Sequence, residues 1–192
     1  MYRLRACTYR DNAKHGKAYT RRDTHDTILP MKKREIPPHH LSISRRKLPH
    51  MQIGNTWCFV TFRTNHFQLS DDARDIVKSS ILYDHGRRYT LAATTVMPDH
   101  AHILILPMET ENRFYSLTAI MQGIKGSTSR RINKLSGNSG RVWQAESFDR
   151  MIRDEAEWEE KYNYILNNSI KAELAERPEE YRWVITIPDA RY

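Results

Sequence analysis

The sequence predicts an α+β fold, with a ferredoxin-like antiparallel sheet and helices on one face. Segments with the composition of strands alternate with segments of helical spacing, and the two central strand segments, 89–97 and 101–107, are separated by only a short turn. A parallel pair would need a crossover of a dozen or more residues, so these strands must be antiparallel. The predicted order is strand, helix, hairpin, helix, strand and helix.

Local sequence predicts the first elements. Residues 56–63 are dense in aromatic and β-branched side chains, which is typical of a strand. Ser70, followed by two aspartates and by apolar residues at helical spacing, predicts a helix that ends by Gly86. Pro98 and Asp99 favour the tight turn of the central hairpin.

The C-terminal half is expected to hold two helices around an extended segment. Apolar residues at helical spacing predict a long helix over 114–135, and the glycines within 137–140 end it. Residues 141–152 have an extended pattern. Asp154 is expected to cap a last helix that runs to about Asn168.

Positive charge is concentrated at the N-terminus. Residues 1–50 hold 13 Lys and Arg against 4 Asp and Glu, out of 31 and 23 in the whole chain. Residues 1–44 also lack any sustained strand or helix period, so we expect a basic, flexible extension there and one folded domain over 45–192. A basic arm is typical of segments that neutralise phosphates, although a solvated leader has the same composition.

Composition excludes several classes of protein. Two cysteines, Cys7 and Cys58, are too few for a disulfide framework or a thiolate zinc site. The longest apolar runs, such as 103–106, fall far short of the roughly 20 residues of a membrane span. The N-terminus lacks the apolar region of a signal peptide. We therefore expect a cytoplasmic protein with no membrane partner.

A His-x-His pair opens the second strand of the hairpin. Residues two apart in a strand face the same side, so His100 and His102 can present both imidazoles to one ion, with Ala101 facing the core. Two neutral imidazoles suit a divalent ion of the transition type, and a third ligand must come from elsewhere. Two surface histidines explain so short a pattern equally well. Leu104 and Ile105 exclude the longer histidine motifs of nucleotide-binding triads and of metal-dependent hydrolases.

The last predicted helix carries a matching half. Tyr164 and Asn168 are four residues apart and therefore share one helical face. An amide oxygen can be a metal ligand, and a phenolate can be a nucleophile. Tyr162 lies on nearly the opposite side, four residues after Trp158, so it is predicted to be structural. A lone tyrosine is more often packed than catalytic, so the spacing of Tyr164 and Asn168 does not by itself identify a nucleophile.

Six segments together resemble the REP-associated tyrosine transposases, a branch of the HUH single-tyrosine transposases. They occur in the family's order over roughly residues 45–184. The segments are RKLPH (46–50), WCFVTFRT (57–64), VMPDHAHILI (96–105), VWQAESFDRMIRDEAEW (142–158), YILNNSIKAEL (164–174) and PEEYRWV (178–184).

The resemblance implies a role for each candidate residue within a catalytic domain of the HUH endonuclease fold. His100 and His102 would bind a divalent metal, Tyr164 would be the nucleophile, and Asn168 would be the third metal ligand. The family usually has Asn-Pro where this chain has Asn168 and Ser169, and Ala-Gly-Leu where it has residues 172–174.

The resemblance also implies the activity: cleavage and rejoining of single-stranded DNA, such as REP-type hairpins, through a 5′-phosphotyrosine intermediate. A tyrosine with a pKa of about 10 is a poor nucleophile, so Mg²⁺ or Mn²⁺ would polarise the phosphate. The expected partner is single-stranded or hairpin DNA, bound by a monomer or a homodimer. Two alternatives stay open: a protein that binds hairpins without cutting them, and a phosphodiesterase in which water attacks.

Basic and aromatic residues outside these motifs are candidate DNA contacts. Lys125, Arg130 and Arg131, on or beside the long helix, can track phosphates, although a solvated basic helix face explains each of them more simply. Trp143 and Phe148 can stack on bases, but both are expected first in the core.

Overall fold

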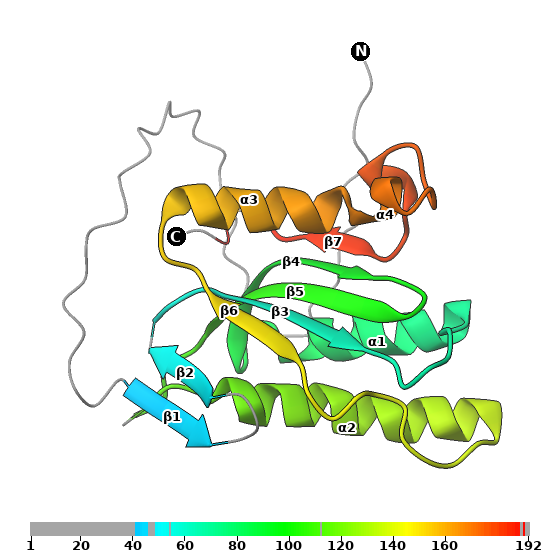
Figure 1. Cartoon of the computed structure of the whole chain (residues 1–192), viewed down its shortest axis with the longest axis horizontal. Coiled ribbons are helices and arrows are strands. Elements are labelled where there is room, and N and C mark those ends of the chain that lie inside the picture. The colour runs from blue at the N-terminus through cyan, green and yellow to red at the C-terminus, as the bar shows by residue number, and fades with distance from the viewer. Residues whose placement is uncertain (1–40, 46–48, 54, 112, 189, 191–192) are drawn as a thin grey trace, which may run out of the picture. The chain divides into compact units, whose positions relative to one another are not determined.

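The computed structural model describes residues 41–45, 49–53, 55–111, 113–188 and 190. The elements in chain order (Figure 1) are β1 (Leu41–Arg45), β2 (Pro49–Ile53), β3 (Cys58–Arg63), α1 (Asp71–Asp84), β4 (Tyr89–Val96), β5 (His100–Pro107), α2 (Leu117–Ser136), β6 (Phe148–Met151), α3 (Glu155–Leu166), α4 (Asn168–Lys171), the 3-10 helix η2 (Pro178–Glu180) and β7 (Val184–Thr186). Within these described ranges, no helix has the length and apolar character needed to cross a bilayer.

The main sheet has five strands in the order β6-β3-β5-β4-β7, and every neighbouring pair is antiparallel. The predicted α+β class and antiparallel sheet are thus confirmed. β1 pairs with β2 in a separate two-stranded sheet, so a strand begins at Leu41, inside the segment 1–44 that was predicted to be an extension. Residues 1–40 lie outside the described part of the chain, and their predicted flexibility and phosphate binding stay predictions.

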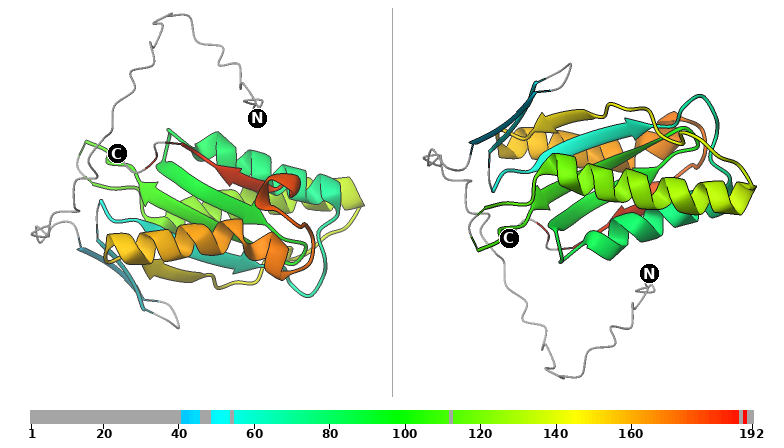
Figure 2. Two further views of the ribbon diagram at one scale, coloured as in Figure 1. Left: turned by 90° about the horizontal axis from the view of Figure 1, so that it is seen from above. Right: turned by 90° about the horizontal axis from the view of Figure 1, so that it is seen from below.

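Helices cover both faces of the main sheet, so the prediction of helices on one face is wrong (Figures 1 and 2). α1 and α2 pack on one face, against side chains such as Val60 and Ile103. α3 packs on the other face, against Phe59 and Leu104. The reason is that nearly all of β4 and β5 is buried, and a strand buried on both sides needs a helix on each face.

The sequence signals for helix ends are confirmed. The Ser70 and Asp154 side chains each accept a hydrogen bond from the backbone N–H three residues later, at the starts of α1 and α3. Ser116 caps α2 in the same way. Gly137 ends α2 in the left-handed conformation, with φ of 66°, which costs glycine little. These caps fix where each helix starts relative to the strands.

Glu157 joins β6 to the first turn of α3. Its carboxylate is only 7% exposed, and it accepts hydrogen bonds from the Arg150 guanidinium and from both the backbone and the side chain of Arg153. Burial alone would raise the pKa of this carboxyl, but the hydrogen bonds from Arg153 and Arg150 outweigh it and lower the pKa from 4.5 to about 2. The ionised form therefore stabilises the start of the helix that carries Tyr164.

Replacing Glu157 with glutamine is expected to lower the free energy of unfolding at pH 7 by about 1–2 kcal/mol, because the two exposed guanidinium groups lose a buried acceptor but regain water. Since the folded-state pKa is depressed, this stabilisation is complete above pH 4.5 and is lost as the pH falls toward 2. Thermal melts of both proteins between pH 7 and pH 2 measure it. A Glu160→Gln control, which alters an exposed ion pair with Lys161, should shift stability by less than about 0.5 kcal/mol. A difference for Glu157→Gln that does not shrink in acid would contradict this role.

Candidate active site

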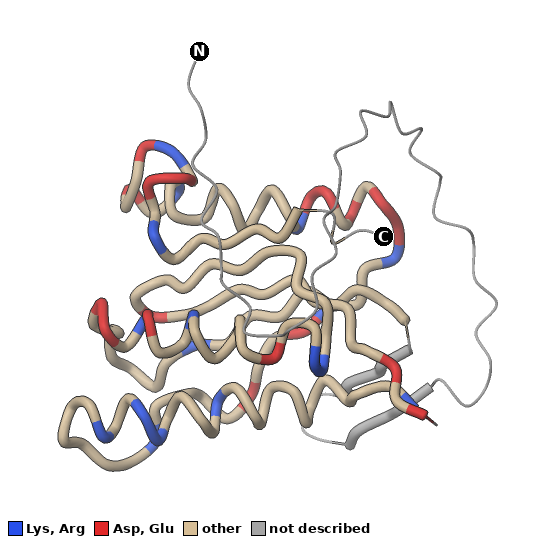
Figure 3. Tube along the Cα trace, turned by 180° about the vertical axis from the view of Figure 1, so that it is seen from behind, with Lys and Arg blue, Asp and Glu red and all other residues tan. Residues whose placement is uncertain are grey.

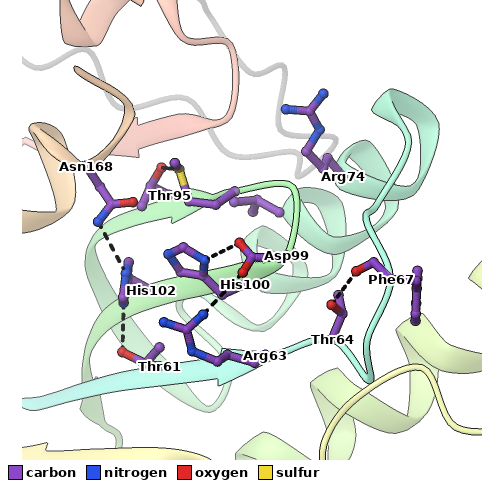
Figure 4. Close-up of polar contacts among 12 residues, drawn as sticks. Thr61, Arg63, Thr64, Phe67, Arg74, Thr95, Asp99, His100, His102 and Asn168 are labelled. Carbon is purple, nitrogen blue, oxygen red and sulfur yellow. Dashed lines mark hydrogen bonds and ion pairs between the residues drawn. The ribbon is translucent and has the colours of Figure 1, made fainter. Parts of the chain in front are cut away.

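His100 and His102 lie on the face of β5 that α3 covers. Ala101, which lies between the two histidines, and Ile103, which follows them, are fully buried in the core on the opposite face. The two imidazoles therefore share one face, as their spacing predicts, with ring centroids 4.7 Å apart (Figure 4).

His102 is held by the neighbouring strand β3. Its Nδ1 is 2.7 Å from the Oγ1 of Thr61, its register partner, and its ring stacks on Phe59. Burial, with smaller effects from the charges of His100 and Arg63, lowers the pKa of His102 from 6.5 to about 3. The ring is therefore neutral at pH 7. With Nδ1 bonded to the threonine hydroxyl, Nε2 is left to face the final helices.

His100 is oriented by an acidic residue in the hairpin turn. Its Nδ1 donates to Asp99 Oδ1 at 2.5 Å, and Oδ2 of the same carboxylate is 3.2 Å from the Arg63 guanidinium. Burial raises the pKa of Asp99, but the hydrogen bond from His100, together with the charges of His100 and Arg63, lowers it overall. The carboxylate therefore stays ionised and leaves Nε2 of His100 as the imidazole nitrogen available to a ligand.

α3 places Tyr164 beside His102. Their ring centroids are 5.1 Å apart, and the tyrosine ring also meets Phe59 edge-on at 5.8 Å. The Lys171 ammonium, from α4, lies 5.3 Å from the centroid of the tyrosine ring. Tyr164 is 37% exposed, so a large molecule can reach it from solvent.

Asn168 approaches the same imidazole from the start of α4. Its Nδ2 lies 3.4 Å from Nε2 of His102, and the side chain is buried. A half-turn of the amide would exchange its oxygen for its nitrogen at this position. The predicted last helix ran to about Asn168, whereas α3 ends at Leu166 and Asn168 opens the short α4. The structure thus brings His100, His102, Tyr164 and Asn168 together.

The chemistry of these side chains fits a divalent metal. Among the described residues, no three His, Cys, Asp or Glu side chains form a group that could hold a metal ion, so a site built on the two imidazoles would need the amide oxygen of Asn168 as its third ligand. Each histidine is hydrogen-bonded through Nδ1, His100 to the Asp99 carboxylate and His102 to the Thr61 hydroxyl, which leaves both Nε2 atoms for a ligand. Partners of this kind orient histidine ligands in metal sites.

The aromatic residues considered in the sequence fall in three different places. Tyr162 stacks on Trp158 with ring centroids 4.9 Å apart, as expected of a structural residue. Trp143 is in the core, where its Nε1 donates to the hydroxyl of Thr128. Phe148 is 61% exposed, so the expectation that it lies in the core is wrong. The reason is that β6 is a short strand at the edge of the sheet.

The three predicted basic DNA contacts do not lie at this site. Lys125, Arg130 and Arg131 belong to α2, on the opposite side of the sheet from α3 (Figures 1 and 3). The Lys125 ammonium donates to the carbonyl of Ala145 and the hydroxyl of Ser147, and the two arginines are exposed. Their role in DNA binding stays a prediction.

Known proteins are similar to this chain in sequence and in fold. The family model described as IS200-like transposase matches residues 59–168, which is more than half of the 192-residue chain. Among solved structures, a REP-associated tyrosine transposase bound to a REP hairpin is similar with a TM-score of 0.57 and 18% identity over 69% of this chain and 77% of that one. A transposase candidate from Deinococcus radiodurans has a TM-score of 0.40 and 20% identity, over 58% of this chain and 88% of that one. No curated protein matches the sequence.

The matched region is the part of the chain that builds the site. It begins at Phe59, on which His102 stacks, and ends at Asn168, beside the same imidazole. The solved structure bound to the REP hairpin shares the fold. The chain therefore belongs to the IS200-like transposase family.

Proposed function

We propose that this transposase cleaves single-stranded or hairpin DNA by attack of the Tyr164 hydroxyl on a backbone phosphate. The observation that carries the proposal is the convergence of Tyr164, His102 and Asn168, with the two rings 5.1 Å apart and the amide 3.4 Å from the imidazole. A bond forms between the phenolic oxygen and phosphorus, and the bond from phosphorus to the 3′ oxygen breaks. The products are a 5′-phosphotyrosine and, once the leaving oxygen takes a proton, a 3′-hydroxyl.

A divalent metal would be held by Nε2 of His100, Nε2 of His102 and Oδ1 of Asn168. When bound, it would offset the charge of the phosphate and make phosphorus more susceptible to attack. Two nitrogen ligands favour Mn²⁺ over Mg²⁺, which prefers oxygen. Thr61 and Asp99 would keep the two rings in position.

The remaining groups of the site act on the nucleophile and the substrate. Phe59 and His102, stacked on each other, both meet the tyrosine ring edge-on, so the hydroxyl does not have to be positioned at the moment of reaction. Lys171 adds a positive charge beside the ring, where negative charge develops as the proton leaves. Because the covalent intermediate keeps the energy of the broken bond, a 3′-hydroxyl can reverse the step and rejoin DNA.

We also place this chain in the REP-associated branch of the family. Six sequence segments in the order of that branch support the assignment. The similar solved structure carries a REP hairpin, and a hairpin with single-stranded flanks is the substrate that we propose here. An unpaired strand suits the site, because a phosphate can reach Tyr164 only where the neighbouring bases are accessible.

Covalent capture tests the proposed function. The full chain is incubated with Mn²⁺ and a set of single-stranded and hairpin oligonucleotides, each labelled at either its 5′ or its 3′ end, and the products are separated under denaturing conditions. We expect a protein adduct that carries the 3′ label and a free fragment that carries the 5′ label. Binding with no adduct would favour a hairpin-binding protein, and cut DNA with no adduct would favour attack by water.

A further inference from the structure

Phe148 is the most exposed phenylalanine among the described residues, at 61%. It opens β6, the edge strand next to β3. An exposed phenyl ring gains free energy when a flat apolar partner covers it. Its position on the sheet determines which partner it can meet.

Strand register places Phe148 in line with the candidate active site. Thr61 pairs with Phe148 on one side and with His102 on the other. Directly paired residues project from the same face of a sheet, so all three face α3. Arg150, two residues further along β6, reaches Glu157 on α3, while Asp149 between them lines a cavity beside α2.

Near Thr61, the sheet edge formed by β3 and β6 is accessible to solvent on the face that carries α3. α3 packs against β4, β5 and Phe59 of β3, and beside it Thr61 is half-buried whereas Arg63 and Phe148 are exposed. We call these three residues the open strip. Neighbouring strands are about 4.8 Å apart, so the backbone of Phe148, at the far end of the strip, lies roughly 10 Å from that of His102.

Arg63 provides the positive charge of the open strip. It is the register partner of His100, and its side chain is 53% exposed while one guanidinium nitrogen contacts Asp99. A guanidinium has five N–H donors in a planar fork, so it can contact a phosphate oxygen while it keeps the carboxylate.

We propose that the open strip binds the nucleotide next to the cleaved bond: the Phe148 ring stacks on the base, and the Arg63 guanidinium binds the phosphate. This inference rests on the proposed function, because it takes single-stranded DNA as the substrate. A base has a flat π-face whatever its identity, so Phe148 would hold the strand without selecting the sequence. The role differs from that of Lys125, Arg130 and Arg131, which lie across the sheet.

A series of oligonucleotides with one abasic position each tests the stacking part. Adduct formation at subsaturating DNA is measured for the wild type, Phe148→Ala and Phe148→Tyr. Loss of one stacked base is expected to slow Phe148→Ala by roughly 5- to 150-fold on intact DNA. At one abasic position next to the cut, wild type and Phe148→Ala should react at the same rate. Phe148→Tyr keeps a flat ring and should remain within about 3-fold of the wild type.

Tyr83→Ala is the matched control, because Tyr83 is an equally exposed aromatic residue on α1. It should react like the wild type on every oligonucleotide. Equal rates for Phe148→Ala and wild type on intact DNA would overturn the stacking role. The stacking role would also be overturned if Phe148→Ala slowed the reaction by the same factor on every oligonucleotide, whichever position is abasic.

Binding measurements on Tyr164→Phe protein separate this inference from the proposed cleavage. Stacking on Phe148 should change the fluorescence of a 2-aminopurine base next to the cut, and the change should be lost when Phe148→Ala is added. If the wild type forms no adduct but this difference remains, the cleavage proposal fails and the open strip stands. If the fluorescence change does not depend on Phe148, the proposed stacking on the open strip is wrong, whether or not the wild type forms an adduct.

Salt dependence tests the phosphate contact of Arg63. Arg63→Gln should reduce the slope of log affinity against log salt concentration by about 0.7, the value of one phosphate contact on a single strand. A residue that only orients Asp99 would leave this slope unchanged, and that result would overturn the phosphate contact.

Discussion

Tyr164→Phe is expected to abolish the protein–DNA adduct, with a loss in rate on the order of 10³-fold or more, because the nucleophilic oxygen is removed. The phenyl ring keeps its contacts with Phe59 and His102. Since the side chain is also 37% exposed, the free energy of unfolding should change by less than about 0.5 kcal/mol. Single-turnover adduct formation, DNA binding and thermal melts of the variant together measure these effects.

Tyr162→Phe is the matched control for this prediction. Its ring would still stack on Trp158, and the hydroxyl lies two residues from the proposed nucleophile on the same helix. Adduct formation should stay at the level of the wild type. An adduct that survives in Tyr164→Phe but disappears in Tyr162→Phe would reassign the nucleophile.

His102→Gln is expected to lower metal-dependent adduct formation by more than about 100-fold, because residues that merely orient a metal ligand already account for 10- to 100-fold. The imidazole is 3% exposed and lies between Thr61, Phe59 and Asn168, so glutamine cannot restore Nε2 at the same place. A titration with Mn²⁺ measures the loss. Saturating metal should not rescue this variant.

Thr61→Val provides the comparison within the same site. The valine keeps the volume of the threonine but removes the hydroxyl that bonds Nδ1 of His102. The apparent Mn²⁺ affinity should fall by about 10- to 100-fold, and excess Mn²⁺ should restore the rate. Full activity of the wild type in the presence of a strong chelator would contradict the metal site altogether.

Local sequence predicted how the candidate side chains are arranged within each half of the site, because short-range rules govern that arrangement, whereas their selection as site residues came from the family resemblance. The turn at Pro98 and Asp99 sets the start of β5, and the two-residue period of a strand then puts His100 and His102 on one face. The cap at Asp154 sets the start of α3 and hence the position of Tyr164 along it. Each of these features is decided within a few residues.

The features of the fold and of the site that the sequence did not predict depend on contacts between distant segments. Which face of the sheet a helix covers is not encoded in its own period, so the side taken by α3 could not be predicted. Thr61 contacts an imidazole 41 positions later, and only the register of β3 with β5 brings the two together. β7 has three residues, too few for a strand pattern, and the neighbouring Tyr181 is tied to β4 by its hydroxyl bond to the Val96 carbonyl.

Mapping of the covalent adduct by mass spectrometry identifies the nucleophile. The adduct formed in Mn²⁺ is digested with protease and nuclease, and the modified peptide is sequenced. We expect a nucleotide joined through its 5′-phosphate to Tyr164. A nucleotide on another residue, or DNA cut to a free 5′-phosphate with no modified peptide, would contradict it.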